Sequence, residues 1–224
     1  MGRDAYSIDE YTQLNAIIRK GGDRIPICFC IDVSRSMQFL TNPMNELIVT
    51  GQGHEDGSNT NIVEIRPGYV AHTRIEELKR VLGKMIQEMK MSPILSQAAI
   101  IDVIVFGQFA DFLIGPVGCH DFNNQSIERI SVDAVDGGTQ TAMGIEMALE
   151  KIDFLISAIE EAGTASYLPV LILMSDGDPT DIEASKIAAQ KLQRRSAENK
   201  LNVIPIAIGR DTAWMRSLSH TNKI

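Results

Sequence analysis

Five oxygen-bearing side chains stand at three points of the sequence where they could together hold a divalent cation. The first point is the run Asp32-Val-Ser34-Arg-Ser36, the second is Thr139, and the third is Asp176. The set offers two carboxylates and three hydroxyls, and it contains neither His nor Cys. Hard oxygen ligands of this kind favour Mg²⁺, with Mn²⁺ or Ca²⁺ as alternatives, over zinc.

The charge of this set indicates what the cation would do. Two carboxylates neutralise a divalent cation without over-neutralising it, and hydroxyl ligands leave it electrophilic. A coordination position open to solvent would then attract an anionic oxygen from outside. The sequence therefore predicts a site that binds a carboxylate of a partner, rather than a cage for the ion.

The two carboxylates follow apolar runs that are typical of strands covered on both faces. Residues 25–31 form an unbroken apolar run that ends at Asp32, and residues 169–174 form another that ends just before Asp176. In an open parallel sheet, ligands bind outside the carboxyl ends of the strands. We therefore expect both carboxylates to lie at the same edge of one sheet.

The remaining pattern predicts an α/β fold. It indicates a three-layer architecture with a mostly parallel central sheet, one antiparallel edge strand and helices on both faces. The antiparallel strand is predicted because residues 99–106 and 109–117 are separated by only two residues. A helix over 181–198 is expected to turn Ile182, Ile187 and Leu192 inward, and Asp178 and Asp181 to serve as turn and helix-cap residues after Gly177.

The chain is divided into a polar N-terminal extension, residues 1–24, and one domain, residues 25–224, with an insertion at about 38–72. Within the insertion, two β-like pieces at 46–50 and 61–66 flank a turn-rich stretch, which predicts a hairpin or loop. The insertion begins directly after the first group of candidate ligands. We therefore expect its base to lie near the metal site.

Composition and charge restrict the partners. The 224-residue chain has a formal net charge of −8, which disfavours nucleic acid and anionic lipid as partners. No apolar run approaches the roughly 20 residues that span a bilayer, so no membrane association is expected. Cys28 and Cys30 lie in the first apolar run, where buried reduced thiols are expected. These features predict a cytoplasmic protein.

Three segments resemble the loops of von Willebrand factor A domains. The run Asp32–Met37 resembles the DxSxS motif of that family, Gly138–Gly144 resembles its second loop and Met174–Thr180 resembles its third. The segments occur in the order of the family, and the likeness spans roughly residues 24–210. The last two loops look most like small bacterial members related to tellurium-resistance proteins.

The resemblance implies a metal-ion-dependent adhesion site (MIDAS) that holds Mg²⁺ and binds an Asp or Glu carboxylate of a partner protein. It implies that Ser34, Ser36 and Thr139 contact the metal, while Asp32 and Asp176 act often through water. Arg35 stands where the family usually has a small residue. It either flanks the metal and favours an acidic ligand or points to solvent.

Two other classes of function compete with this interpretation. A metal-dependent hydrolase or phosphatase of the haloacid dehalogenase type would need a second aspartate two residues after Asp32, where Ser34 stands. No phosphate-binding glycine loop with lysine and no nucleophile elbow is present either, so we expect no enzymatic activity. The third class is a scaffold in which the metal is purely structural.

Overall fold

The central feature of the structure is a five-stranded sheet with the strand order β5-β4-β1-β6-β7. The computed structural model describes residues 6–41, 47–55, 58–65, 71–132, 138–209 and 213–218. The strands of this sheet are β1 (Ile25–Asp32), β4 (Ala99–Phe106), β5 (Ala110–Gly118), β6 (Val170–Ser175) and β7 (Asn202–Ala207). All neighbours are parallel except β5, which pairs antiparallel with β4 at the edge. The predicted fold class is confirmed.

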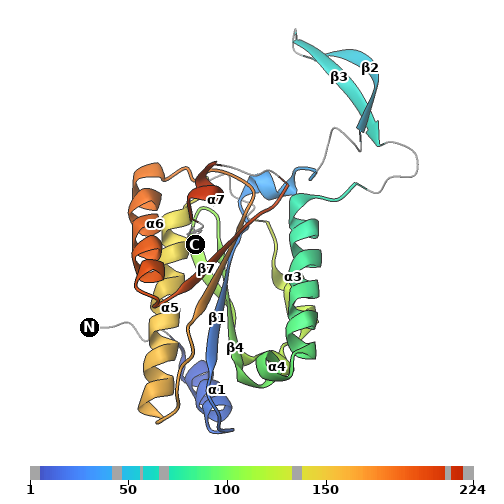
Figure 1. Ribbon diagram of the computed structural model, residues 1–224. Helices are drawn as coiled ribbons and strands as arrows, with labels where there is room; N and C mark the ends of the chain where they lie inside the picture. Colours follow the sequence, from blue (N-terminus) through green and yellow to red (C-terminus); the bar gives the residue numbers. More distant parts are fainter. Residues whose placement is uncertain are drawn as a thin grey trace, which may run out of the picture.

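Helices cover both faces of the sheet (Figure 1). One face carries α3 (Arg74–Met91) and α4 (Pro93–Ala98). The other carries α1 (Ile8–Ile18), α5 (Thr141–Glu161), α6 (Ile182–Ala197) and α7 (Ala213–Leu218). Because β1 is buried on both faces, its side chains alternate between two cores: Phe29 packs on the α3 side, and Cys28 and Cys30 pack on the α5 side. Both thiols are free and buried, as predicted.

The position of β1 determines where a ligand site can form. The chain continues from β1 to β4 on one side, while β6 lies on the other side of β1. Ile31 is in register with Met174, so β1 and β6 end side by side. The carboxyl end of β1 is therefore the point where the strand order reverses, which is where open α/β sheets bind ligands.

One predicted helix face is wrong. Ile182 and Ile187 are 54% and 58% exposed, although Leu192 is fully buried as expected. The buried face of α6 consists of four residues at helical spacing, Ser185, Ala188, Ala189 and Leu192. Apart from Leu192 these side chains are small, so α6 can lie close to α5 and β7, and this close packing leaves both isoleucines outside the contact.

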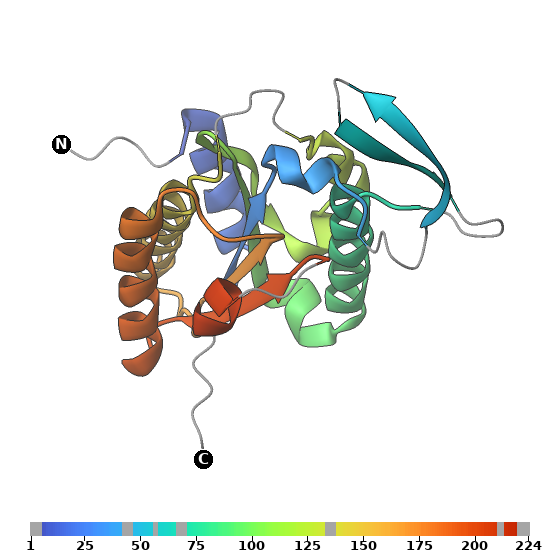
Figure 2. The same ribbon diagram turned by 90° about the horizontal axis from the view of Figure 1, so that it is seen from above.

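The insertion forms a hairpin of its own, separate from the main sheet. Its strands are β2 (Leu47–Glu55) and β3 (Ser58–Ile65), which pair antiparallel and are both longer than predicted. Glu46 and Arg66, the outer ends of the predicted pieces, lie outside the described residues. Figure 1 shows the hairpin beyond the start of α3, at the end of the molecule where the parallel strands of the main sheet end, and Figure 2 views the molecule from that end.

Residues of the predicted N-terminal extension pack on the domain. Ser7 and Glu10 form a capping box that begins α1, and Leu14 and Ile18 pack in a core with Ile100 of β4. The division of the chain at residue 24 stays a prediction. In the part of the chain that the structure describes, no helix is long and apolar enough to span a bilayer.

Candidate metal centre

Asp32 lies at the base of the candidate site. It is the last residue of β1, and its side chain is fully buried. Its Oδ1 accepts a hydrogen bond from the backbone N–H of Ser34 at 2.8 Å, and its Oδ2 accepts one from Oγ of Ser175 at 2.6 Å. Burial raises the pKa of Asp32 to about 6 despite these hydrogen bonds, and the nearby Asp176 carboxylate adds to the rise. A cation at this position would offset that destabilised negative charge.

The two serines and Asp176 form a chain of hydrogen bonds beside Asp32. Ser34 and Ser36 stand at the start of η1 (Arg35–Gln38), and their Oγ atoms lie 3.1 Å apart. Oγ of Ser36 donates to Oδ1 of Asp176 at 2.9 Å. Because β1 and β6 end side by side, the first and third loops deliver these oxygens to one point. Arg35, between the two serines, is exposed at the surface.

Thr139 is held against the third loop through its main chain. Its N–H donates to Oγ1 of Thr180 at 2.8 Å, and its carbonyl accepts from the N–H of Thr180 at 3.0 Å. Gly138 has a φ of +88°, and a Cβ there would lie 2.6 Å from Oγ1 of Thr180. The glycine is therefore needed for this close approach, which places the second loop beside the third.

Asp181 connects the same two loops in a way that the sequence did not reveal. Asp181 stands at the N-cap position of α6, as predicted, but its carboxylate accepts no hydrogen bond from the backbone N–H groups of that helix. Its carboxylate instead accepts hydrogen bonds from the N–H groups of Thr141 and Ala142 at 3.1 and 3.0 Å, at the start of α5. Oγ of Ser185 donates to the same carboxylate at 2.6 Å. The third loop thus caps the helix that follows the second.

Arg74 is the residue of the site that sequence reasoning missed. Its Nη1 lies 2.5 Å from Oδ2 of Asp176, and only 18% of the Arg74 side chain and 1% of the Asp176 side chain are exposed. Arg74 is the first residue of α3, directly after the insertion. Its backbone N–H donates to the carbonyl of Phe39, whose ring lies under the guanidinium group at 5.7 Å. No sequence motif places an arginine here, because the insertion separates it from the first loop.

The donor set suits a hard divalent cation. Two buried carboxylates and a pair of serine hydroxyls converge, and the second loop, which carries Thr139, is hydrogen-bonded to the third. Among the described residues, no group of three or more His, Cys, Asp or Glu could hold a metal ion. The candidate site differs from such clusters because three of its five side chains carry hydroxyls, and an all-oxygen ligand set favours Mg²⁺ or Mn²⁺ over softer ions. The residues that could hold the ion are Asp32, Ser34, Ser36, Thr139 and Asp176.

Exposed apolar side chains lie around this edge of the sheet. Phe39 follows η1, and Phe109 lies in the turn between β4 and β5, where the carbonyl of Gly107 accepts a hydrogen bond from the N–H of Gln140 next to Thr139. Met143 and Ile182 are exposed near the starts of α5 and α6. We name Phe39, Phe109, Met143 and Ile182 the apolar rim. Apolar side chains grouped around a polar site are a feature of protein-binding surfaces.

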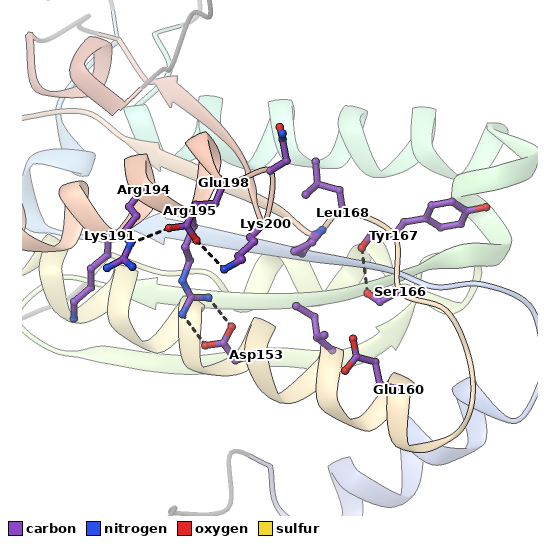
Figure 3. Close-up of a pocket in the computed structure, with 13 residues that line it drawn as sticks. Asp153, Glu160, Ser166, Tyr167, Leu168, Lys191, Arg194, Arg195, Glu198 and Lys200 are labelled. Atoms are coloured by element: carbon purple, nitrogen blue, oxygen red, sulfur yellow. Dashed lines mark hydrogen bonds and ion pairs between the residues drawn. The ribbon is translucent and has the colours of Figure 1, made fainter.

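A hollow of about 670 Å³ lies away from this edge, between α5, the last turns of α6 and the segment before β6 (Figure 3). It is rich in charged side chains, and its cations are paired, Lys191 with Glu146 outside the hollow and the others within it. Arg195 forms two hydrogen bonds with Asp153, and both Arg194 and Lys200 lie within ion-pair distance of Glu198. Since its cations are already paired, this hollow is a weaker candidate for an anion site than the carboxyl edge of the sheet.

Comparisons with known proteins show likeness in structure only. Neither protein families nor curated proteins give a sequence match. The manganese-loaded TRAP protein of Plasmodium vivax superposes with a TM-score of 0.54 at 14% identity, over 89% of this chain and 63% of that one. Proximal thread matrix protein 1 of the mussel byssus superposes with a TM-score of 0.55 at 16% identity, over 89% and 41%.

The chain thus spans less than two thirds of the length of either solved structure. At such low identity the likeness concerns the fold alone. Together with the strand order, the antiparallel edge strand and the two helical layers, it supports one conclusion. The chain has the mostly parallel α/β fold of a von Willebrand factor A domain.

Proposed function

We propose that this chain is a metal-dependent protein-binding module that holds one divalent cation, Mg²⁺ in preference to Mn²⁺ or Ca²⁺, and uses it to bind a partner carboxylate. The cation is held by Asp32, Ser34, Ser36, Thr139 and Asp176. One observation carries the proposal: two loops far apart in the sequence bring Oγ of Ser36 and Oδ1 of Asp176 to 2.9 Å, beside the buried Asp32 carboxylate.

The candidate ligands contribute different properties to the site. Asp32 supplies buried negative charge, and Ser175 and the backbone of Ser34 hold its orientation. The hydroxyls of Ser34, Ser36 and Thr139 add neutral oxygens, which leave the bound ion with attraction for one further anionic oxygen. The TRAP protein of similar fold is manganese-loaded, which supports Mn²⁺ as an experimental probe of the site.

The apolar rim favours a protein over a small carboxylic acid as the ligand. Phe39 and Phe109 are 60% and 66% exposed, and a free acid would leave both rings in water. A partner that presents Asp or Glu among apolar side chains would cover them, and each fully buried side chain of this size contributes about 1.5–3 kcal/mol. We infer a partner protein of this kind, in a bacterial cytoplasmic complex such as a stress or tellurium-resistance system, and no catalytic role.

The experiment is capture of partners from a cell extract with Mg²⁺ or with EDTA, followed by affinity measurements on the partner identified. Thr139→Ala should keep the melting temperature within a few degrees, yet weaken metal-dependent binding by about tenfold or more, which corresponds to about 1.4 kcal/mol. A partner that binds equally well in EDTA would indicate a purely structural metal. Metal-dependent hydrolysis lost in Asp32→Ala would instead favour an enzyme.

A further inference from the structure

Arg74 changes the charge of the candidate metal centre. Its guanidinium group is paired with Oδ2 of Asp176, while Oδ1 of the same carboxylate accepts the hydrogen bond of Ser36. Counted with Arg74, the site carries two negative charges and one positive charge before any ion binds. A divalent cation would then leave one positive charge in excess, and one carboxylate from a partner would remove it.

The position of Arg74 is determined by its contacts with other segments, and not by a contribution to the stability of α3. Thr73 and Glu76 form the capping box of α3, and the N–H of Arg74 is bonded to the carbonyl of Phe39. A cation in the first turn of a helix is disfavoured by the helix dipole, so Arg74 does not serve to stabilise α3. Its charged partner is Asp176, on the neighbouring loop of the site.

Arg74 also joins the metal centre to the base of the insertion. Leu40 and Thr73 form a β-bridge, and the N–H of Thr41 donates to the carbonyl of His72 at 3.0 Å. On the other side, Gly209 has a φ of +74°, and a Cβ there would lie 3.3 Å from Nε of Arg74. The two ends of the insertion therefore meet where they hold the guanidinium group against Asp176.

We infer that Arg74 makes metal binding and carboxylate binding depend on each other. The inference rests on the proposed function and adds a residue that determines its specificity. Arg74 and the metal both interact with the Asp176 carboxylate, and their positive charges repel each other. Arg74 therefore weakens metal binding when no anion is present. The excess positive charge strengthens binding of an anion once the metal is present. By linkage, the anion then raises metal affinity by the same factor.

The test is Mn²⁺ titration, by calorimetry and by the electron paramagnetic resonance signal of free Mn²⁺, with sodium acetate as the anion and sodium chloride at equal ionic strength as its control. Arg74→Gln removes the charge. Arg80→Gln is the matched control, because Arg80 lies on the same helix, is exposed and forms an ion pair with a neighbouring side chain, Glu77. It lowers the net charge equally, but away from the site.

Without acetate, Arg74→Gln should bind Mn²⁺ about fivefold or more tightly than the wild type, because one positive charge is removed from beside the ion. The factor by which acetate strengthens Mn²⁺ binding should be smaller in Arg74→Gln than in the wild type. Arg80→Gln should match the wild type in both respects.

Equal or weaker Mn²⁺ binding by Arg74→Gln, or an unchanged acetate factor, would overturn the inference, since Arg74 would then only position Asp176. A different result would contradict the proposed function. If Thr139→Ala and Ser36→Ala leave Mn²⁺ binding intact, the ion is bound elsewhere and both proposals are wrong. If these variants abolish binding while Arg74→Gln has no effect, only the role of Arg74 is wrong.

Discussion

Thr180 forms two hydrogen bonds with the main chain of Thr139. Its hydroxyl accepts one from the N–H of Thr139 at 2.8 Å, and its own N–H donates one to the carbonyl of Thr139 at 3.0 Å. Thr180 thus positions a candidate metal ligand without being one. We expect Thr180→Val to weaken Mn²⁺ binding severalfold and to cost about 1–2 kcal/mol of stability, because the N–H of Thr139 loses its acceptor.

Titration calorimetry and urea unfolding would measure the two effects of Thr180→Val. Thr180→Ser keeps the hydroxyl and serves as the control, with binding close to that of the wild type. If Thr180→Val bound Mn²⁺ as tightly as Thr180→Ser, the contact between the second and third loops would be irrelevant to the site.

Two helix glycines are predicted to respond to alanine with opposite signs. A Cβ at Gly144 of α5 would lie 2.7 Å from the Phe106 ring of β4, whereas one at Gly83 of α3 would meet only Cδ1 of Ile127 at 3.6 Å. Gly144→Ala should therefore destabilise the fold by about 1–3 kcal/mol through overpacking. Gly83→Ala should stabilise it by about 0.5–1 kcal/mol, since glycine is a poor helix former.

Thermal unfolding of both glycine variants checks this expectation. The same sign of shift in both would mean that α5 does not lie against β4 as described. The pair is informative because Gly144 belongs to the second loop motif, so its role is to bring α5 close to the sheet rather than to contact a metal.

Much of the site follows from the sequence because its residues are close to strand ends. Asp32 and Asp176 could be placed at one edge since apolar runs of this kind form parallel strands, and Ser34 and Ser36 come directly after the first. Arg74 could not be placed at the site from the sequence, because its approach to Asp176 depends on how the ends of the insertion meet.

Which face of α6 is buried could also not be predicted from the sequence. Hydrophobicity favoured Ile182 and Ile187 as inward residues, but close packing selected the small side chains of Ala188 and Ala189. Asp181 is the predicted N-cap residue of α6, but the hydrogen bonds of its carboxylate to α5 could not be predicted, because they need the second and third loops to be neighbours. In each case the deciding contact is between segments far apart in the chain.

Asp102 predicts a pH dependence of stability that is separate from the metal site. Its side chain is fully buried beneath α1, where it accepts a hydrogen bond from Tyr6, and in the described part of the chain its Oδ1 has no hydrogen-bond partner. Burial raises the pKa of Asp102 to about 7, although Tyr6 and Lys151 oppose the rise. The native protein therefore holds a proton here that the unfolded chain releases at lower pH.

The sign follows from linkage. A raised pKa means that the stabilising contribution of Asp102 is complete below about pH 4 and is lost as the pH rises through 7. Urea unfolding of Asp102→Asn between pH 4 and 7 should show a smaller loss of stability than the wild type. Burial lowers the pKa of Lys151, and this shift acts on stability in the opposite sense. Parallel profiles for the two proteins would show that Asp102 does not titrate in this range.

The apolar rim predicts a variant that loses the partner but keeps the metal. Phe109→Ser should weaken partner binding by about tenfold, as expected for losing 1–2 kcal/mol of apolar contact, and leave Mn²⁺ affinity unchanged. Ile187→Ser is the matched control, because Ile187 is similarly exposed but lies farther along α6. Binding reduced equally by both variants would mean that the rim is not the contact surface.

The central claim is that three loops hold a divalent cation whose open position takes a carboxylate. Crystals grown with MnCl₂ and sodium acetate allow a direct test by anomalous diffraction at the manganese edge. We expect one strong peak, with Oγ of Ser34 and Ser36 and Oγ1 of Thr139 at about 2.1–2.2 Å and an acetate oxygen completing the coordination. A well-ordered site without a manganese peak, or a peak elsewhere only, would contradict it.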